Sequence, residues 1–584
     1  MLHKISTPVL LAILLYNGYQ YYKQWHLQQT VENYRLKRNP SIKVDHQKNL
    51  TAEPEIIKVT DEMYVAVGYA LGNSIMLIGP TGVVIIDTTE SLVAARQIAK
   101  EFRKITEKPV KGIIYTHNHA DHVLGTEAFL ENHPDRASVE VWAHHTLPLN
   151  FFHFMRVTGK AGYIRAMHQF GALLKTQQIS SGIGHKLKLD NIAPTFVSPN
   201  KFLYKEKQTI KLAGIDIALM HVPGETDDTI CVYWPEKQAL LGTDNLYKAF
   251  PNLYAIRGTT FRSLKQWYES LDKMRALRPK YFIMSHHKPL IGEDIVYTIT
   301  TEYRDAVQLV HDQTVRFINQ GMHPDKIAEA ISLPETLRKN PYLKELYGTV
   351  RWSSKGLYSG YMGWFSGDIS ELDPLTPIER SKRLVSLVGG TENVLKASEK
   401  ALNDDDPKWS LYLSSSVVNT EPENTKAKEL KAKALLDMAE LQTSFNGYNY
   451  YKTAAYVTLG TLKITPNKDK FKAAVEQSTI TELFYLMALK FKTEECSYLD
   501  KIVLFEFSDT KQRVKFHIRN GVMDVSGIYR DAKEDLKVTI NSVTWKSILT
   551  GEKSGLLAAV TSEIIAEPGI SDLRVVMECF DRNV

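Results

Sequence analysis

Short apolar runs, turns and helical segments alternate along the chain from Pro54 to Gly292. The apolar runs over 76–78 and 83–86 flank Gly79–Gly82, and this arrangement predicts a β-hairpin. Apolar residues then recur at helical spacing over 92–105, and a buried strand is expected over 112–115. Strands mixed with helices in this way predict a layered α/β domain.

The pattern changes twice farther along the chain. Helical periodicity dominates after Asp294, with helices predicted over 301–320, 324–331, 377–387, 391–402 and 425–441. After Pro466 the pattern predicts a helix over 471–490, strands over 503–507, 514–519, 522–527 and 536–540, and helical segments over 543–561. We therefore expect an all-α region followed by a small α+β domain.

The N-terminus carries a short apolar run. Lys4 precedes apolar residues from Pro8 to Tyr16, which is the pattern of a signal peptide or a signal anchor over 1–25, followed by a linker over 26–53. The run is short for a membrane span, and an amphipathic N-terminal helix is the alternative. The pattern predicts a secretory, extracellular or periplasm-like location, or membrane association through this segment alone.

Composition adds limits on function. The 584 residues are 43% hydrophobic and 24% charged, which is typical of a globular protein with several domains. The net charge is only +6 and no basic aromatic stripe is present, so we do not expect nucleic acid as a partner. The three cysteines, Cys231, Cys496 and Cys579, match no zinc-binding spacing and are too few for a disulfide framework.

Four potential metal ligands follow the predicted strand 112–115. His117, His119, Asp121 and His122 lie within six residues of one another. On a helix they would point in several directions, but on a loop that leaves a buried strand they can converge. Imidazole and carboxylate groups together suit Zn²⁺ or a similar divalent ion.

Three later strand ends also carry ligand-type side chains. Glu225, Asp244 and His286 each follow a predicted strand. Any one of them alone would be read as an ordinary polar residue at a strand end. Their sequential order, after the histidine-rich loop, points to one shared metal-binding edge.

The segment Thr116–His122 resembles the H-x-H-x-D-H signature of the metallo-β-lactamase superfamily. The resemblance implies an α/β fold, the αββα sandwich, with two metals at one edge. It implies that His117 and His119 hold the first metal and that Asp121 and His122 hold the second. It also gives Asp244 a bridging position, His286 the last ligand position and His287 a neighbouring one.

Glu225 stands where this superfamily usually has a histidine, as in the zinc-dependent alkyl sulfatase family. Residues 252–258 (NLYAIRG), 158–171 and 363–368 (GWFSGD) also resemble segments of that family. The resemblance implies a metallo-β-lactamase domain over 54–295, a helical dimerisation domain over 296–463, and a domain like sterol carrier protein type 2 over 464–584.

The resemblance implies a dinuclear zinc hydrolase that uses a metal-activated water to cleave linear alkyl sulfates, such as dodecyl sulfate, to alcohol and sulfate. Asp121 and Asp244 would be catalytic, and the two Zn²⁺ ions would be bound within one chain of a homodimer. Substrate contacts are expected from Asn252, Tyr254, Arg257, Arg165 and His287.

Three departures from the family pattern lie near the expected substrate. Asp244 stands where the family commonly has Glu, and Lys160 and Ile164 replace its Asn and Arg. Two alternatives therefore stay open. One is hydrolysis of another ester, such as a lactone, thioester or phosphoester, and the other is a non-catalytic lipid-binding protein.

Overall fold

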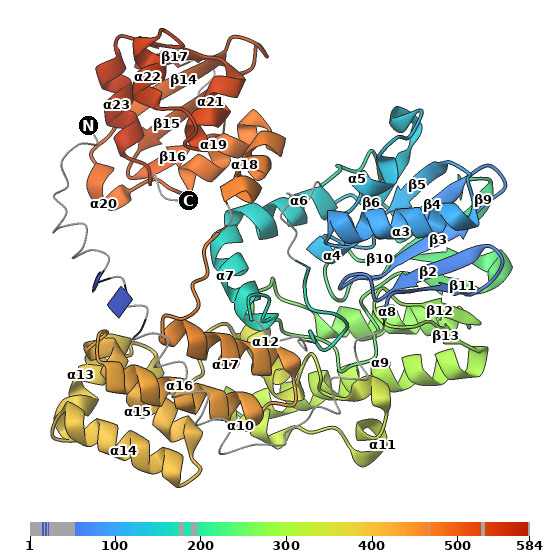
Figure 1. Ribbon diagram of the computed structural model, residues 1–584, viewed down its shortest axis with the longest axis horizontal. Coiled ribbons are helices and arrows are strands. Elements are labelled where there is room, and N and C mark those ends of the chain that lie inside the picture. Colours follow the sequence, from blue (N-terminus) through green and yellow to red (C-terminus); the bar gives the residue numbers. More distant parts are fainter. Residues whose placement is uncertain are drawn as a thin grey trace. The chain divides into compact units, whose positions relative to one another are not determined.

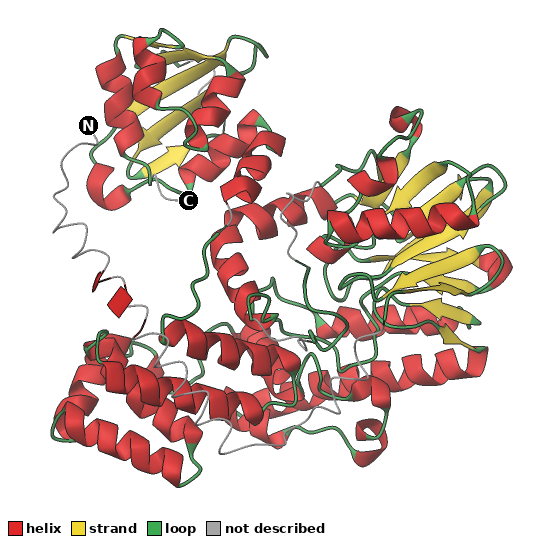
Figure 2. Ribbon diagram, viewed as in Figure 1, coloured by secondary structure: helices red, strands yellow, loops and turns green. Residues whose placement is uncertain are grey.

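The computed structural model describes residues 15–16, 18–19, 22, 53–174, 180–188, 196–466, 468–526 and 532–581 (Figures 1 and 2). The expected signal segment and linker therefore lie almost wholly outside the described residues. Among the described helices, none has the length and apolarity needed to cross a membrane. The chain forms two compact units, one joining the chain up to Asn150 with Gly162–Thr465, the other joining Phe151–Ala161 with the chain from Pro466 onward.

The first unit begins with a seven-stranded sheet whose spatial order follows the sequence. Its strands are β1 (Glu55–Lys58), β2 (Met63–Val67), β3 (Ser74–Ile78), β4 (Val83–Ile86), β5 (Val110–Ile114), β6 (Glu140–His144) and β7 (Lys201–Leu203). Strands β1 to β4 pair antiparallel, which confirms the predicted hairpin between β3 and β4, and β4 to β7 pair parallel. The central strands β4 and β5 are almost wholly buried. Strand β4 is apolar throughout, and in β5 only Lys111 is partly exposed.

A second sheet of six strands has the order β13-β12-β11-β10-β9-β8. Its strands are β8 (Lys207–Leu212), β9 (Ile215–His221), β10 (Ile230–Trp234), β11 (Ala239–Leu241), β12 (Tyr281–Ile283) and β13 (Leu290–Ile291). Only β11 and β12 run parallel, so their carboxyl ends lie side by side.

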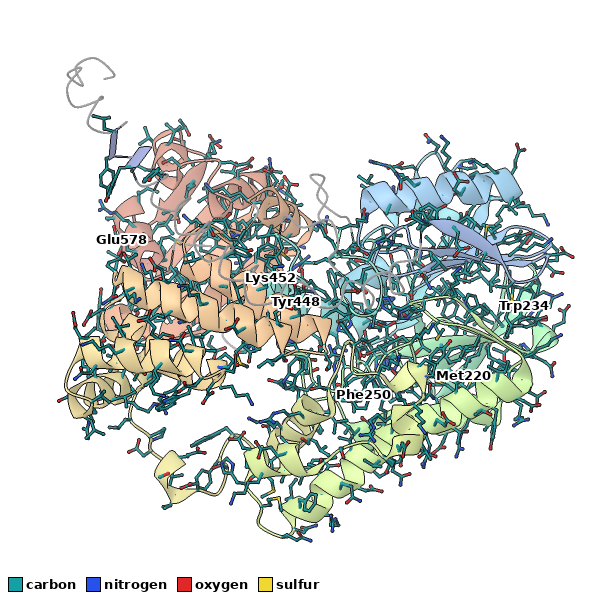
Figure 3. All side chains as sticks on the ribbon, turned by 60° about the horizontal axis from the view of Figure 1, so that its bottom comes forward. Met220, Trp234, Phe250, Tyr448, Lys452 and Glu578 are labelled. Atoms are coloured by element: carbon teal, nitrogen blue, oxygen red, sulfur yellow. A yellow bond between two sulfur atoms is a disulfide. The ribbon has the colours of Figure 1, made fainter. Side chains whose placement is uncertain are left out.

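The two sheets pack face to face around one apolar core. It contains residues of both sheets, including Val65, Ile75, Val84, Ile114, Leu219, Val232, Leu241 and Ile283. Helix α3 (Leu92–Ile105) lies across the first sheet in Figure 1 and buries Ala95, Ile98 and Phe102. Helices α8 (Leu264–Ala276) and α9 (Glu293–Ile318) cover the second sheet in a core that includes Met220 and Phe250, both labelled in Figure 3. This confirms the αββα sandwich.

Shorter helices occupy the connections of the sandwich. They are α4 (Ala120–Val123), α5 (Glu127–Leu130), α6 (Leu147–Phe152) and α7 (Gly159–Gln169). Helix α4 begins inside the histidine-rich loop directly after β5, so the chain turns sharply at the strand end. This turn is what allows neighbouring side chains of the loop to face one point.

The rest of the first unit is helical, as predicted. Its helices are α10 (Pro324–Ala330), α11 (Glu335–Arg338), α12 (Val350–Met362), α13 (Pro377–Leu387), α14 (Thr391–Asn403), α15 (Pro407–Thr420), α16 (Thr425–Glu440) and α17 (Phe445–Thr458). Helices α14 to α17 pack through small apolar cores that include Val394, Leu413, Leu430 and Leu435. Proline begins α10, α13 and α15, where its missing N–H costs no helical hydrogen bond.

The second unit is a small α+β domain. Its five-stranded sheet has the order β16-β15-β14-β17-β18 and consists of β14 (Lys501–Phe507), β15 (Arg513–Arg519), β16 (Val522–Asp524), β17 (Leu536–Ile540) and β18 (Ile564–Glu567). The helices are α18 (Lys468–Gln477), α19 (Ile480–Ala488), α20 (Thr493–Cys496), α21 (Ser542–Leu549), α22 (Gly555–Val560) and α23 (Ile570–Glu578). An aromatic core of Phe484, Phe505, Phe516 and Trp545 joins sheet and helices.

Two features of this unit were not predicted. Cys496 and Cys579 form a disulfide across 83 residues, so the cysteines provide one bridge although they are too few for a framework. The segment Phe151–Ala161, which precedes most of α7, belongs to this unit as well. Its Arg156 donates to the Ser478 hydroxyl at 2.7 Å and lies 3.2 Å from the Glu482 carboxylate.

Candidate metal centre

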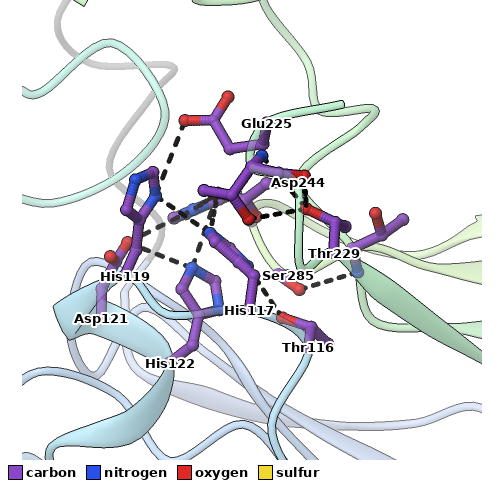
Figure 4. Close-up of polar contacts among 12 residues, drawn as sticks. Thr116, His117, His119, Asp121, His122, Glu225, Thr229, Asp244 and Ser285 are labelled. Atoms are coloured by element: carbon purple, nitrogen blue, oxygen red, sulfur yellow. Dashed lines mark hydrogen bonds and ion pairs between the residues drawn. The ribbon is translucent and has the colours of Figure 1, made fainter. Parts of the chain in front are cut away.

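Seven predicted ligands gather at the carboxyl ends of the sandwich strands (Figure 4). The histidine-rich loop follows β5, Glu225 follows β9, Asp244 follows β11 and His286 follows β12. All seven side chains except Asp121 are buried. The fold therefore brings together residues that are up to 169 positions apart, as their order in the sequence predicted.

Two groups of donor atoms share one carboxylate. The donor atoms of Asp121, His122, Asp244 and His286 all lie within 4.8 Å of one another, and those of His117, His119 and Asp244 do the same. Asp244 Oδ2 lies 3.1 Å from His286 Nε2, 3.5 Å from His122 Nε2 and 3.9 Å from His117 Nε2. Asp244 is thus placed between the two groups.

Glu225 lies beside the first group. Its Oε1 lies 3.7 Å from Nδ1 of His119, and that nitrogen lies 3.0 Å from Nε2 of His117. In the second group, Asp121 Oδ2 lies 3.5 Å from both His122 Nε2 and His286 Nε2. Each group can therefore offer a cation two imidazoles and carboxylate oxygens.

Four groups of the cluster have protonation preferences that suit a cation. Burial lowers the pKa of His117 and His119 well below the usual value, so both imidazoles are neutral and can donate a lone pair. Burial alone would raise the pKa of Asp121, but His122 and His286 hold it at about 2. Burial also opposes ionisation of Asp244, but the same two histidines keep its pKa well below the usual range. For His122 and His286 burial acts to lower the pKa, but neighbouring aspartates raise it, so a cation would displace a proton from each of these two rings.

Unpartnered buried atoms provide a second test of the fit. His122 Nε2 and Asp244 Oδ1 are buried and have no hydrogen-bond partner among the described residues. Buried polar atoms without a partner are costly, and a divalent cation would satisfy both. Nitrogen and oxygen donors of this kind fit zinc and similar divalent metals.

Asp87 orients two of the histidines and was not predicted as a site residue. It follows β4 with a left-handed backbone (φ 57°), a conformation that Asp tolerates better than most residues. Its Oδ2 lies 2.7 Å from His122 Nδ1 and accepts from the Thr116 hydroxyl at 2.8 Å. The Thr116 oxygen in turn lies 3.0 Å from His117 Nδ1. With Nδ1 as the hydrogen-bond donor in both rings, Nε2 is the nitrogen that would ligate a metal in each.

His286 is held by a separate loop. Its Nδ1 lies 2.9 Å from the carbonyl oxygen of Leu71, and the N–H of Leu71 donates to the buried carboxylate of Glu90. Asn73 in the same loop donates through its side chain to the carbonyls of Met284 and His287. The loop 71–73 thereby fixes the segment that carries His286.

Comparison with known proteins places the chain in a family. The metallo-beta-lactamase superfamily profile matches residues 68–286, and the alkyl sulfatase dimerisation profile matches residues 323–460. A linear primary-alkylsulfatase of Pseudomonas sp. is 31% identical over 522 residues, which cover 87% of this chain and 98% of that protein. The chain belongs to the alkylsulfatase family of the metallo-β-lactamase superfamily.

Two other alkylsulfatases agree with this assignment. An alkyl/aryl-sulfatase of Saccharomyces cerevisiae is 26% identical over 93% of this chain and 84% of its own length. The solved structure of a stereoselective inverting sec-alkylsulfatase from Pseudomonas sp. has a TM-score of 0.84 at 25% identity and covers 92% of this chain and 86% of that one.

In this alkylsulfatase-family chain, Arg257 and Asn252 are the two predicted substrate-binding residues whose contacts agree best with that prediction. Arg257 is buried, and its Nη2 lies 3.3 Å from His119 Nε2. Asn252 is also buried, and its side-chain nitrogen has no hydrogen-bond partner among the described residues. Arg257 therefore places a positive charge beside the candidate metal centre, and the side-chain amide of Asn252 has an N–H group that could donate to a substrate.

The other three residues predicted to contact substrate have contacts elsewhere. Arg165 donates to the carbonyl of Ile256 at 2.7 Å and so supports the backbone next to Arg257. Tyr254 packs beside α12, where a Cβ added to Gly356 would lie 2.7 Å from the Tyr254 Cβ. His287 accepts from the N–H of Lys248 at 3.2 Å and has a left-handed backbone.

Arg262 is a further site residue that sequence reasoning missed. Its Nη1 lies 2.8 Å from Glu225 Oε2 and also donates to the carbonyl of Asn252. Burial raises the pKa of Glu225 to about 7, although Arg262 opposes this shift. Nothing in the sequence around Arg262 distinguishes it from other arginines, so only the folded chain identifies it.

Proposed function

We propose that this chain hydrolyses sulfate esters of alkyl alcohols to the alcohol and inorganic sulfate. The convergence of seven ligand-type side chains beside the buried guanidinium of Arg257 is the observation that carries the proposal. The names of the relatives support the substrate class, because primary and secondary alkylsulfatases are among them.

We further propose two zinc ions within each chain. His117, His119 and Glu225 would hold the first, Asp121, His122 and His286 the second, and Asp244 both. Bound there, the ions would supply Lewis acidity and lower the pKa of a water molecule in the site. Asp121 and Asp244 offset the cationic charge, and Asp87 holds His117 and His122 in the tautomer that ligation requires.

Arg257 is proposed to bind the sulfate group. A sulfate monoester carries one negative charge, and a guanidinium can hold two of its oxygens through parallel hydrogen bonds. The side-chain nitrogen of Asn252 would add a neutral donor. Phe170, whose ring centre lies 5.8 Å from the Arg257 guanidinium carbon, belongs to an apolar cluster with Leu71 and Tyr347 that could receive the alkyl chain.

The test is a comparison of esters on the metal-loaded protein. Dodecyl sulfate is incubated beside dodecyl phosphate, a lactone and a thioester, and the products are quantified. Release of inorganic sulfate with little turnover of the other three supports the proposal. Preferred cleavage of another ester would overturn the substrate class, and no turnover with stoichiometric binding of a lipid would favour a non-catalytic lipid-binding protein.

Three expectations about the whole molecule accompany this proposal. We propose a homodimer formed through the region 323–460 that matches the dimerisation profile, which sedimentation of the purified chain would test. We propose an oxidising secretory compartment or a membrane-anchored form, which the Cys496–Cys579 disulfide supports and cell fractionation would test. The likeness of the C-terminal domain to sterol carrier protein type 2 stays a prediction, and lipid binding by that domain would support it.

A further inference from the structure

A cavity of about 510 Å³ lies in the helical part of the first unit, and none of its lining residues belongs to the metal centre. It lies where α11, α12, α16 and α17 meet, and Tyr448, which lines it, is labelled in Figure 3. Its apolar wall consists of Ile331, Leu333, Leu343, Val350 and Phe445. The volume is in the range of pockets that bind small molecules.

Two cations at the cavity lack a carboxylate partner. Arg338, at the end of α11, and Lys344 both line the cavity and are exposed in the single chain. Among the residues that the structure describes, neither lies within ion-pair distance of a carboxylate. A third cation, Arg351, is 3.5 Å from Glu329 in an exposed pair, which costs little to separate.

The remaining charges of the lining also favour an anion. Three cationic side chains and two carboxylates, Glu345 and Glu440, line the cavity, so the lining has a net positive charge. Glu345 is occupied because it accepts the N–H of Val350.

We propose that this cavity is a second binding site, separate from the metal centre, for an amphiphile with a linear alkyl chain and an anionic head. The head would lie at Arg338 and Lys344, and the chain would lie along Leu333, Leu343 and Phe445. The inference does not depend on the proposed hydrolysis, because binding here requires neither a metal nor a cleavable ester.

The test uses decane-1-sulfonate, which has no sulfate ester to cleave, in isothermal titration of the full-length, metal-loaded protein below the micelle concentration. Measurements are made in the Arg257→Ala background, which removes the arginine expected to bind sulfonate at the metal centre. We expect one bound sulfonate for each chain. Arg338→Glu should weaken binding at least about tenfold, since a lost charged contact has this size. Ser332→Trp, which places a bulky ring at an exposed lining residue, should weaken binding by filling the space that the ligand needs.

Lys339→Glu is the matched control, because Lys339 is adjacent, exposed and paired with Glu335 but does not line the cavity. It should leave the affinity unchanged. Decanoate tests a carboxylate head and should also bind, while decan-1-ol should bind much more weakly. The proposal is overturned if Ser332→Trp and Arg338→Glu, both folded by circular dichroism, bind sulfonate as the Arg257→Ala protein does, or if decan-1-ol binds equally well.

Discussion

Arg262 and Glu225 form a buried ion pair at the candidate metal centre, with 2.8 Å between Nη1 and Oε2 and side chains that are 1% and 3% exposed. Because Arg262 holds Oε2, Oε1 is the oxygen that faces His119. Glu225 replaces a histidine of the superfamily, so its extra negative charge needs compensation. Arg262 supplies that charge from the side away from the histidines.

Removing Arg262 should destabilise the metal-free protein, because Glu225 loses its buried partner. We expect Arg262→Met to lower the free energy of unfolding of the metal-free protein by about 3–5 kcal/mol, because Glu225 is left as an uncompensated buried charge. The double variant Arg262→Met/Glu225→Gln should lose less free energy of unfolding than Arg262→Met alone. The exposed pair Arg136–Glu127 offers a control, since Arg136→Met should cost under about 1 kcal/mol in urea unfolding. Equal losses at the two arginines would contradict this role for Arg262.

Asp87→Asn should weaken metal binding while preserving the fold. Asn tolerates the left-handed backbone at this position, but both oxygens of Asp87 accept hydrogen bonds and an amide has only one oxygen. Oδ1 accepts from the Thr116 N–H, and Oδ2 accepts from the Thr116 hydroxyl and faces His122 Nδ1, so the amide nitrogen would oppose a donor in either orientation. A shift of the His122 proton to Nε2 would then block the ligand atom. We expect about 10–100-fold weaker metal affinity by competition with a chelator. Unchanged affinity would show that Asp87 does not set the tautomer.

Arg257→Ala should separate substrate binding from metal binding. Metal content should stay at the wild-type level, because Arg257 is not among the donor groups of the cluster. The value of kcat/KM for dodecyl sulfate should fall by about 10²–10³-fold, the size expected for the loss of one strong donor to a developing charge. Arg165→Ala, which removes only a contact to the Ile256 carbonyl, should have a smaller effect. Parallel loss of metal in Arg257→Ala would instead indicate a structural role.

Acid should destabilise the protein partly through His144. Burial is the main cause that lowers the pKa of His144 to about 4, and His221 and His145 add to it, with ring centres 4.3 and 4.4 Å away. The unfolded chain protonates near pH 6.5, so between pH 6.5 and 4 it binds a proton that the folded chain does not. Stability contributed by neutral His144 is therefore present above this window and is lost as the pH falls through it.

His144→Gln should flatten that dependence. Between pH 6.5 and 4.5 the free energy of unfolding of the variant should fall less than that of the wild type. One proton accounts for a difference of at most about 1.4 kcal/mol for each pH unit. The exposed His153 provides a control, because His153→Gln should follow the wild-type profile. Identical slopes in all three proteins would rule out His144 as a source of acid sensitivity.

Local pattern in the sequence predicted a layered α/β domain, the helical region and the ligand cluster, and the resemblance of the histidine-rich loop to a known signature implied the αββα sandwich. His117, His119, Asp121 and His122 stand together after a buried strand, and order along the chain connected them with the later ligands. Arg262 was missed because its partner Glu225 lies 37 positions earlier, with no local signal linking the two. The Cys496–Cys579 bridge and the grouping of Phe151–Ala161 with the C-terminal unit also depend on tertiary contacts alone.

Metal content and sulfate release, measured on one preparation of the wild type and of the His119→Ala and Asp121→Ala variants, test the central claim most directly. We expect two divalent ions for each wild-type chain by elemental analysis, together with sulfate release from dodecyl sulfate. Each variant should lose metal and turnover while keeping its circular dichroism spectrum. Near-zero metal in an active wild type, or full turnover in either variant, would contradict the account.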